Sequence, residues 1–204
     1  MPRPRSFEET EALDAAIDCF WRQGRDGASV RDLAAEMGIN GPSLYNAFGD
    51  KQALFARALE RYVDCFVRER IERLERLPSP KAAIAGFFEE LIQRSISDPL
   101  QRGCLLINAA MEQPSDDPAL RAQVQRYLDE LKGFFRRALE RAIAQKEVPA
   151  SLDPEDVSRL LLAVVIGLRA TARLEPTEAA LRGVVRPMLS LLDAPFSTPP
   201  DSQS

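Results

Sequence analysis

Ser29 to Phe48 reads SVRDLAAEMGINGPSLYNAF, and its apolar residues and helix breakers predict two short helices joined by a turn. Its first half has the apolar spacing i, i+3, i+4 and i+7 that is typical of a short helix with one buried face, at Val30, Leu33, Ala34 and Met37. Gly38 follows the last of these residues, and a glycine in that place can adopt the left-handed conformation that ends a helix. The chain is therefore expected to turn sharply at Gly38.

The second half of the stretch predicts another short helix. Asn40 can cap its N-terminus, and Pro42 falls at an early helical position where a missing N–H costs nothing. The residues expected to face inward are Leu44, Ala47 and Phe48, and those expected to face solvent are Ser43, Tyr45 and Asn46. Two short helices joined in this way form a helix-turn-helix, whose second helix enters the major groove of DNA.

This part of the chain resembles the DNA-binding head of the TetR family of transcriptional regulators. The segment ALDAAIDCFWRQGRDGASVRDLA is similar to the family's first helix with its Phe-x-x-x-Gly ending, followed by a loop and a Ser/Thr-Val helix start. The segment GINGPSLYNAFGDKQALF matches the family pattern Gly-(Val/Ile)-x-x-x-(Ser/Thr)-(Leu/Ile)-Tyr-x-x-Phe-x-x-Lys-x-x-Leu. The close resemblance covers roughly the first quarter of the chain, and the remainder resembles the family in its helical layout and in the phrase GCLLINAAME.

The resemblance implies a set of DNA contacts around the second helix of the motif. Hydroxyl and amine groups are expected to bind phosphates, amide side chains to bind base edges or phosphates, and Gly41 and Pro42 to allow close approach. The predicted set is Arg3, Arg5, Ser29, Arg31, Asn40, Gly41, Pro42, Ser43, Tyr45, Asn46 and Lys51. For Tyr45 a second interpretation stays open, as a partly buried packing aromatic.

Charge and composition limit the possible functions. The chain of 204 residues has a formal net charge of −4, which disfavours DNA binding in general, but residues 39–49 contain no acidic residue. Local charge can therefore support binding, with weak non-specific affinity. The chain has no histidine, so the usual general base and metal ligand are missing, and we expect neither an enzyme nor a bound metal or cofactor. Its three cysteines do not make a disulfide framework.

The remaining pattern predicts an all-α fold, in which a three-helix helix-turn-helix domain precedes a helical bundle. We expect the DNA-binding domain at residues 1–50, a helical effector-binding and dimerisation domain at 51–192, and a disordered Pro/Ser-rich tail at 193–204. One long fourth helix is expected from Lys51 to Pro78, and a sixth from Arg102 to Gln113. The longest apolar run is shorter than the ~20 residues of a membrane span, and the start of the chain lacks a signal peptide, so a cytoplasmic protein is expected.

The last two expected helices suggest a homodimer. Leu160 to Leu168 is apolar on all sides, which is typical of a helix buried on several faces. Such a helix fits the interior of a monomer, or it fits a four-helix bundle between two subunits, which the family resemblance implies. The residues assigned to this interface are Ala163, Ile166, Gly167, Ala170, Val184, Val185, Met188 and Leu191.

An effector pocket is expected among the helices of the bundle, although most of its candidates would be core residues in any case. The candidates are Phe66, Phe87, Phe88, Leu91, Cys104, Leu105, Asn108, Met111, Tyr127, Leu131 and Phe134. This composition favours a small, largely apolar effector. Cys104 follows Arg102 and Gly103, and it is either an inert thiol or a sensor of electrophiles or oxidants.

These observations and the resemblance together imply a homodimeric transcriptional regulator. The expected mechanism is a repressor that binds a palindromic operator on double-stranded DNA and is released by its effector. Three alternatives stay open: a thiol-based sensor that uses Cys104, a helical adaptor that binds protein rather than DNA, and a helical enzyme that retains the head.

Overall fold

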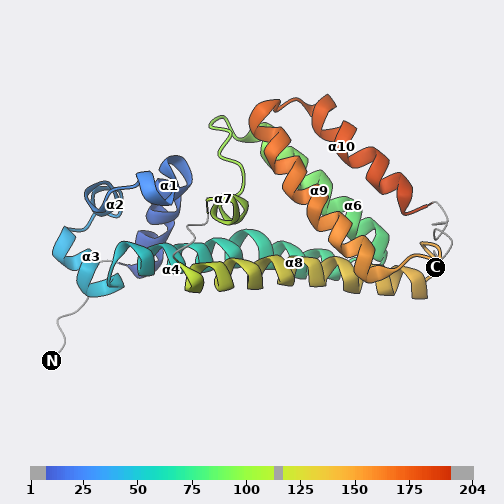
Figure 1. Ribbon diagram of the computed structural model, residues 1–204, viewed down its shortest axis with the longest axis horizontal. Coiled ribbons are helices and arrows are strands. Elements are labelled where there is room, and N and C mark those ends of the chain that lie inside the picture. Colours follow the sequence, from blue (N-terminus) through green and yellow to red (C-terminus); the bar gives the residue numbers. More distant parts are fainter. Residues whose placement is uncertain (1–7, 113–116, 194–204) are drawn as a thin grey trace, which may run out of the picture. The chain divides into compact units, whose positions relative to one another are not determined.

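The structure is a computed structural model that describes residues 8–112 and 117–193. Every regular element within those ranges is helical, which confirms the predicted all-α fold (Figure 1). None of the described helices is both long and apolar enough to cross a membrane.

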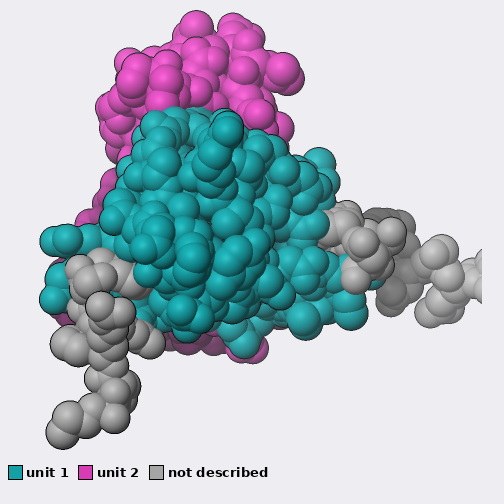
Figure 2. Space-filling view, turned by 90° about the vertical axis from the view of Figure 1, so that its left-hand side faces the viewer, with its two compact units in different colours: residues 1–70, 102–127 teal, residues 71–101, 128–204 magenta. Residues whose placement is uncertain are grey.

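The chain divides into two compact units, which Figure 2 colours separately. The first comprises Met1–Arg70 and Arg102–Tyr127, and the second comprises Ile71–Gln101 and Leu128–Ser204. The predicted domain boundary between residues 50 and 51 therefore falls inside the first unit. Residues 51–70, which follow the predicted helix-turn-helix, belong to the same unit as the helix-turn-helix itself.

The first unit begins with α1 (Glu9–Gly27), α2 (Val30–Glu36), α3 (Gly41–Phe48) and α4 (Lys51–Val63). Helices α1 and α4 pack closely, and the rings of Phe20 and Phe55 meet edge to face with centroids 4.9 Å apart. Both rings are almost fully buried, so the short helices α2 and α3 are supported by a core that α1 and α4 provide.

The single long helix predicted after α3 runs without a break from Lys51 to Glu75, but it contains a π-helical turn that was not predicted. Helix α4 leads into a π-helical turn, η1 (Asp64–Arg68), and then into α5 (Glu69–Glu75). Apolar spacing does not distinguish an α-helical turn from a π-helical one, because the extra residue shifts the stripe by only part of a turn. The predicted sixth helix also starts later, as α7 (Leu105–Met111), because Gln101 and Gly103 have φ values of 50° and 76°.

The second unit contains α6 (Pro80–Ser97), α9 (Pro154–Leu174), α10 (Glu178–Leu191) and the C-terminal part of α8 (Pro118–Ala144). Its core is an aromatic cluster in which neighbouring ring centroids lie 5.1–5.8 Å apart, formed by Phe87, Phe88, Phe134 and Phe135. All four rings are buried. Helices α6, α9 and α10 are each capped by a side chain, from Ser79, Asp153 and Thr177.

Candidate nucleic-acid interface

The turn between α2 and α3 has the hydrogen bonds of a glycine-terminated helix. Gly38 has a φ of 66°, its N–H donates to the carbonyl of Ala35 at 3.2 Å, and the N–H of Ile39 donates to that of Ala34 at 3.0 Å. These two bonds satisfy carbonyl groups that the end of α2 would otherwise leave free. The predicted sharp turn at Gly38 is confirmed.

Helix α3 starts on a capping side chain and has one buried face. The Oδ1 atom of Asn40 accepts a hydrogen bond from the N–H of Ser43 at 2.8 Å, and Pro42 lies in the first helical turn. Leu44 and Phe48 are buried, at 0% and 4% exposure. The local sequence therefore sets both the start of α3 and the face that it turns to solvent.

The opposite face of α3 carries the side chains available to a partner. Tyr45 is 53% exposed and Asn46 is exposed as well, so Tyr45 is not a packing aromatic in this chain. Pro42 and Asn40 are exposed, while Gly41 and Ser43 are half-buried. The exposed face of α3 is therefore an uncharged, polar surface.

Of the two predicted cationic contacts that the structure describes, Arg31 is more accessible than Lys51, with 94% of its side chain exposed. Its Nε atom lies 4.0 Å from Asp32, so the guanidinium is only loosely held. Arg3 and Arg5 lie outside the described residues.

Two predicted phosphate contacts already have partners inside the chain. The Nζ atom of Lys51 donates to the carbonyls of Asp26 at 3.3 Å and Ala28 at 3.1 Å, so this amine caps the end of α1. The hydroxyl of Ser29 accepts from the N–H of Asp32 at 3.1 Å and donates to its carboxylate at 2.5 Å. The hydrogen bond from the Ser29 hydroxyl lowers the pKa of Asp32. Lys51 thus links the start of α4 to the end of α1, and Ser29 caps the start of α2.

Arg57 of α4 is a contact that the sequence analysis missed. Its Nη1 atom donates to the carbonyl of Ala47 at 3.3 Å, its guanidinium lies 4.8 Å from the ring centre of Phe48, and it forms an ion pair with Glu9 of α1. It thus joins the C-terminal end of α3 to both α1 and α4. The sequence contained one signal for such a contact. The last turn of α3 has no basic residue, although a cation is favourable at the C-terminal end of a helix, so a cation from another element could be expected there.

A polar network fixes the other side of α4 to α8 within the first unit. The buried Tyr127 hydroxyl donates to the carboxylate of Glu60, and Gln123 Nε2 donates to that hydroxyl at 2.7 Å and to the carbonyl of Ala56 at 2.9 Å. Burial, with the bond to Glu60, raises the pKa of Tyr127. Burial would also raise the pKa of Glu60, but hydrogen bonds from Tyr127 and Arg68 outweigh it and lower that pKa.

The predicted effector residues do not gather in one compact unit. Those in the first unit are Phe66, Cys104, Leu105, Asn108, Met111 and Tyr127, and those in the second are Phe87, Phe88, Leu91, Leu131 and Phe134. Met111 is 76% exposed, whereas the members from the second unit are all buried and pack into its core.

Cys104 precedes α7 and is half-buried. The hydroxyl of Tyr62 donates to its sulfur at 3.4 Å. The neighbouring guanidinium of Arg102 lies 4.3 Å from the ring centre of Trp21, and its Nη1 is 3.2 Å from Asp18. The cation that sequence reasoning placed beside the thiol is therefore held by an aromatic ring and a carboxylate. No metal-binding cluster of cysteine or acidic side chains occurs in residues 8–112 and 117–193.

Two family models match the two parts of the chain. Residues 12–58 match the model for bacterial regulatory proteins of the TetR family, and residues 80–188 match the tetracyclin repressor-like C-terminal domain. The chain belongs to the TetR family. It is 32% identical to the HTH-type transcriptional regulator YezE of Bacillus subtilis over 195 residues, which cover 95% of this chain and 100% of that protein.

Other TetR-family relatives include proteins named as repressors. The chain is 28% identical to the transcriptional repressor ComR of Escherichia coli over 176 residues, which cover 84% of this chain and 82% of ComR. A cysteine mutant of the regulator CifR, solved in complex with 26-bp operator DNA, superposes with a TM-score of 0.83 at 34% identity. That match covers 92% of this chain and 98% of the CifR chain. The chain is thus a transcriptional regulator of the TetR family, with the family's N-terminal domain at residues 12–58.

The residues predicted for a dimer interface divide into two groups. Ala163, Gly167, Ala170 and Leu191 are exposed, and Ile166 and Val184 are half-buried. Val185 and Met188 are each 5% exposed, because they pack into the core of their own chain. These two residues were assigned to the wrong face of α10, since its apolar residues cover two sides of the helix.

Proposed function

We propose that this protein is a cytoplasmic repressor that binds a near-palindromic operator as a homodimer and leaves it when a small effector binds. The observation that carries the proposal is the exposed face of α3, where Tyr45 and Asn46 stand on a capped helix that has no acidic residue. Two relatives support the proposal: ComR is named a transcriptional repressor, and a CifR mutant was solved in complex with operator DNA. One such helix reads few base pairs, so specificity requires two of them.

The homodimer is supported by an apolar stripe on the outer side of α9. Exposed residues recur there at alternating spacings of three and four, at Leu160, Ala163, Gly167, Ala170 and Leu174. Leu174 is 87% exposed, and a Cβ atom added to Gly167 would meet nothing within 4 Å. Small residues between two leucines allow a second helix to approach closely, as in a four-helix bundle. A twofold dimer would present two α3 helices about 34–36 Å apart.

Operator release requires a conformation of the first unit that the effector favours. Helix α4 fits this role, because Arg57 holds α3 on one side and Glu60 holds Tyr127 of α8 on the other. An effector that binds better to a conformation with displaced α4 helices would change the spacing of the two α3 helices. The required coupling is about 1–3 kcal/mol for a graded response.

The test of the proposal is operator binding, measured by fluorescence anisotropy on DNA from the upstream region of the protein's own gene. Tyr45→Ala and Asn46→Ala should each weaken binding at least tenfold, while Gln125→Ala, an exposed change on α8, should leave it unchanged. Normal binding by both α3 variants would refute the assignment of this face. Equal weakening by Gln125→Ala would show that the loss is not specific.

The dimer has its own test. Ala163→Glu places a charge in the middle of the apolar stripe on α9, where it should give a monomeric mass in sedimentation equilibrium and weaken operator binding. Arg121→Gln, which changes an exposed residue of α8, should remain dimeric. A monomeric mass for the unchanged protein at micromolar concentration would contradict the proposed assembly.

Release through oxidation or alkylation of Cys104 is a second proposal, which the hydrogen bond from Tyr62 supports. Because the sulfur accepts this hydrogen bond, modification of Cys104 would break the contact between α4 and the start of α7. Release of DNA by a quinone should then disappear in Cys104→Ser and persist in Cys65→Ser. Unchanged release by the Cys104→Ser protein would eliminate this mechanism.

A further inference from the structure

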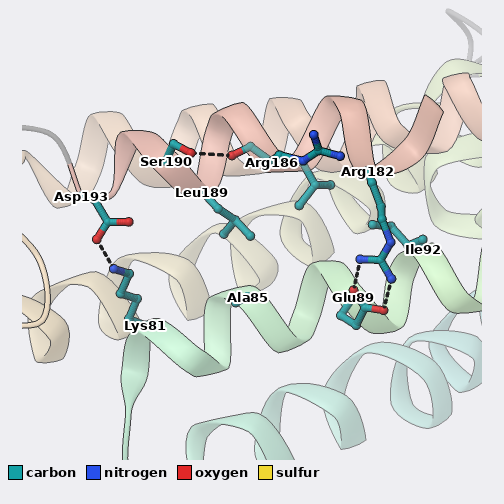
Figure 3. Close-up of a pocket in the computed structure, with 10 residues that line it drawn as sticks. Lys81, Ala85, Glu89, Ile92, Arg182, Arg186, Leu189, Ser190 and Asp193 are labelled. Atoms are coloured by element: carbon teal, nitrogen blue, oxygen red, sulfur yellow. Dashed lines mark hydrogen bonds and ion pairs between the residues drawn. The ribbon is translucent and has the colours of Figure 1, made fainter. Parts of the chain in front are cut away.

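A groove of about 340 Å³ lies between α6 and α10 in the second unit (Figure 3). None of the predicted effector residues lines it. On α10 its lining recurs along one helical face at Arg182, Val185, Arg186, Leu189 and Asp193. On α6 it recurs at Lys81, Ala85, Glu89 and Ile92. The volume is at the lower end of the range found for small-molecule sites.

The two ends of the groove are closed by ion pairs between the helices. Arg182 binds Glu89 through two hydrogen bonds of 2.7 Å each, and Lys81 pairs with Asp193 (Figure 3). Each acidic residue of the lining therefore already has a cationic partner, although Arg182 is shared with Glu178 of α10. A cationic ligand would have to break one of these pairs in order to find a carboxylate.

Arg186 lies between the two ion pairs, and it is the exception among the basic residues of the groove. Its exposed guanidinium makes no hydrogen bond or ion pair with any residue in the described part of the chain, and only its backbone carbonyl is used, by the hydroxyl of Ser190 at 3.1 Å. A guanidinium has five donors in a planar fork that matches a carboxylate. Among the basic residues that line the groove, Arg186 is thus the one whose charge is not paired with a carboxylate of the described residues.

The wall between the charged groups is apolar. Ile92 and Val185 are buried at 1% and 5% exposure, and Ala85 and Leu189 are half-buried beside them. An inorganic anion would leave the partly exposed Ala85 and Leu189 in contact with water, whereas a neutral apolar molecule would leave the Arg186 guanidinium unpaired. A molecule with one carboxylate and a short apolar body satisfies both parts of the lining.

We propose that the groove between α6 and α10 is a second ligand site, which binds small apolar monocarboxylates through Arg186. The carboxylate lies against the guanidinium, and the apolar body covers the exposed parts of Leu189 and Ala85. This site is independent of the proposed operator binding, because it requires neither DNA nor the α3 surface.

Titration calorimetry on the full chain without DNA tests this site with matched pairs of probes. Hexanoate and phenylacetate should bind with a Kd of about 1 mM or tighter, within the reach of ligands of this size. Hexanamide and phenylacetamide, which lack the charge, should bind at least tenfold more weakly, and acetate, which lacks the apolar body, should not bind. Equal affinity for an acid and its amide would overturn the role of charge.

Two variants locate the binding. Arg186→Gln should weaken both acids at least tenfold and leave the amides unchanged, while Arg121→Gln, an exposed arginine outside the groove, should bind as the unchanged protein does. Ala85→Trp should fill the groove and abolish binding of acids and amides alike. Full hexanoate affinity in Arg186→Gln would refute the site. Because Arg186 is exposed, that variant keeps its fold, which circular dichroism checks, and the test stands even if Ala85→Trp unfolds.

Discussion

The α2–α3 segment and the α4–η1–α5 segment are neighbours in sequence, but they are held by different kinds of contact. The boundaries of α2 and α3 are set by groups close to them in sequence. Examples are the Asn40 cap at the start of α3 and the hydrogen bonds around Gly38 at the end of α2. Helix α4 is held by side chains from distant parts of the chain, including Glu9, Asp14 and Tyr127. Changes in the first segment should therefore act on α3 itself, and changes in the second should act on its orientation.

The largest expected effect comes from the buried side of α3. Leu44→Ala removes a side chain with 0% exposure and should lower the free energy of unfolding by about 2–5 kcal/mol, as measured by urea denaturation. Tyr45→Ala, one residue further on, removes an exposed ring and should change stability by no more than about 0.5 kcal/mol. If Tyr45→Ala were as destabilising as Leu44→Ala, the division of α3 into a buried face and a face available to DNA would be wrong.

The difference between the two segments also explains what could be predicted from the sequence. Gly38, Asn40 and Pro42 act on backbone atoms close to them, so their residue types alone indicated the turn and the start of α3. Arg57 and Glu60 act through partners 48 and 67 residues away, and no spacing rule identifies such pairs.

The same limit applies to the second unit. Its apolar spacing predicted the helices, but it did not separate the two apolar sides of α10, so Val185 and Met188 were placed on the surface. The groove was missed because its lining consists of ordinary helix-surface residues on α6 and α10. Only the packing of these two helices places Arg186 beside an apolar wall, with no side-chain partner in residues 8–112 and 117–193.

A smaller effect is expected at the turn. Gly38 has a φ of 66°, and a Cβ atom there would meet nothing within 4 Å, so Gly38→Ala tests backbone strain without steric clash. A left-handed conformation costs an L-residue about 1–2 kcal/mol, and the thermal midpoint should fall accordingly. Gly41→Ala is the matched control, because its Cβ atom also has open space and its backbone is helical. Equal losses in the two variants would show that the conformation of Gly38 is not the cause.

Arg57 tests the contacts of α4 with α3. Arg57→Met keeps much of the side-chain volume but removes the bonds to Ala47 and Glu9 and the contact over Phe48, so stability should fall by about 1 kcal/mol. Because α3 would lose its anchor, operator affinity should fall several-fold more than this small destabilisation explains. Arg57→Lys should restore part of the stability without restoring the planar contacts. Wild-type operator affinity in Arg57→Met would mean that α3 does not need this anchor.

The smallest effect concerns acid stability at the bond between α4 and α8. The folded-state pKa of Glu60 is lowered, so its contribution to stability is present above the unfolded pKa of about 4.3 and is lost as the pH falls through the folded value. Glu60→Gln should therefore be less stable at pH 7 and should lose less stability between pH 5 and pH 3. Because 40% of the carboxylate side chain is exposed, the difference should stay under about 1 kcal/mol.

Tyr127→Phe isolates the hydrogen bond within this network. It removes the donor to Glu60 and leaves the buried ring in place, so the loss of stability between pH 5 and pH 3 should again be smaller than in the unchanged protein. Since both changes break the same bond, the double variant should be less destabilised than the sum of the two single variants. Strict additivity would show that Glu60 is stabilised by Arg68 and Arg126 without Tyr127. The contribution of Glu60 to the contact with α8 would then be its ion pair with Arg126, which salt can screen.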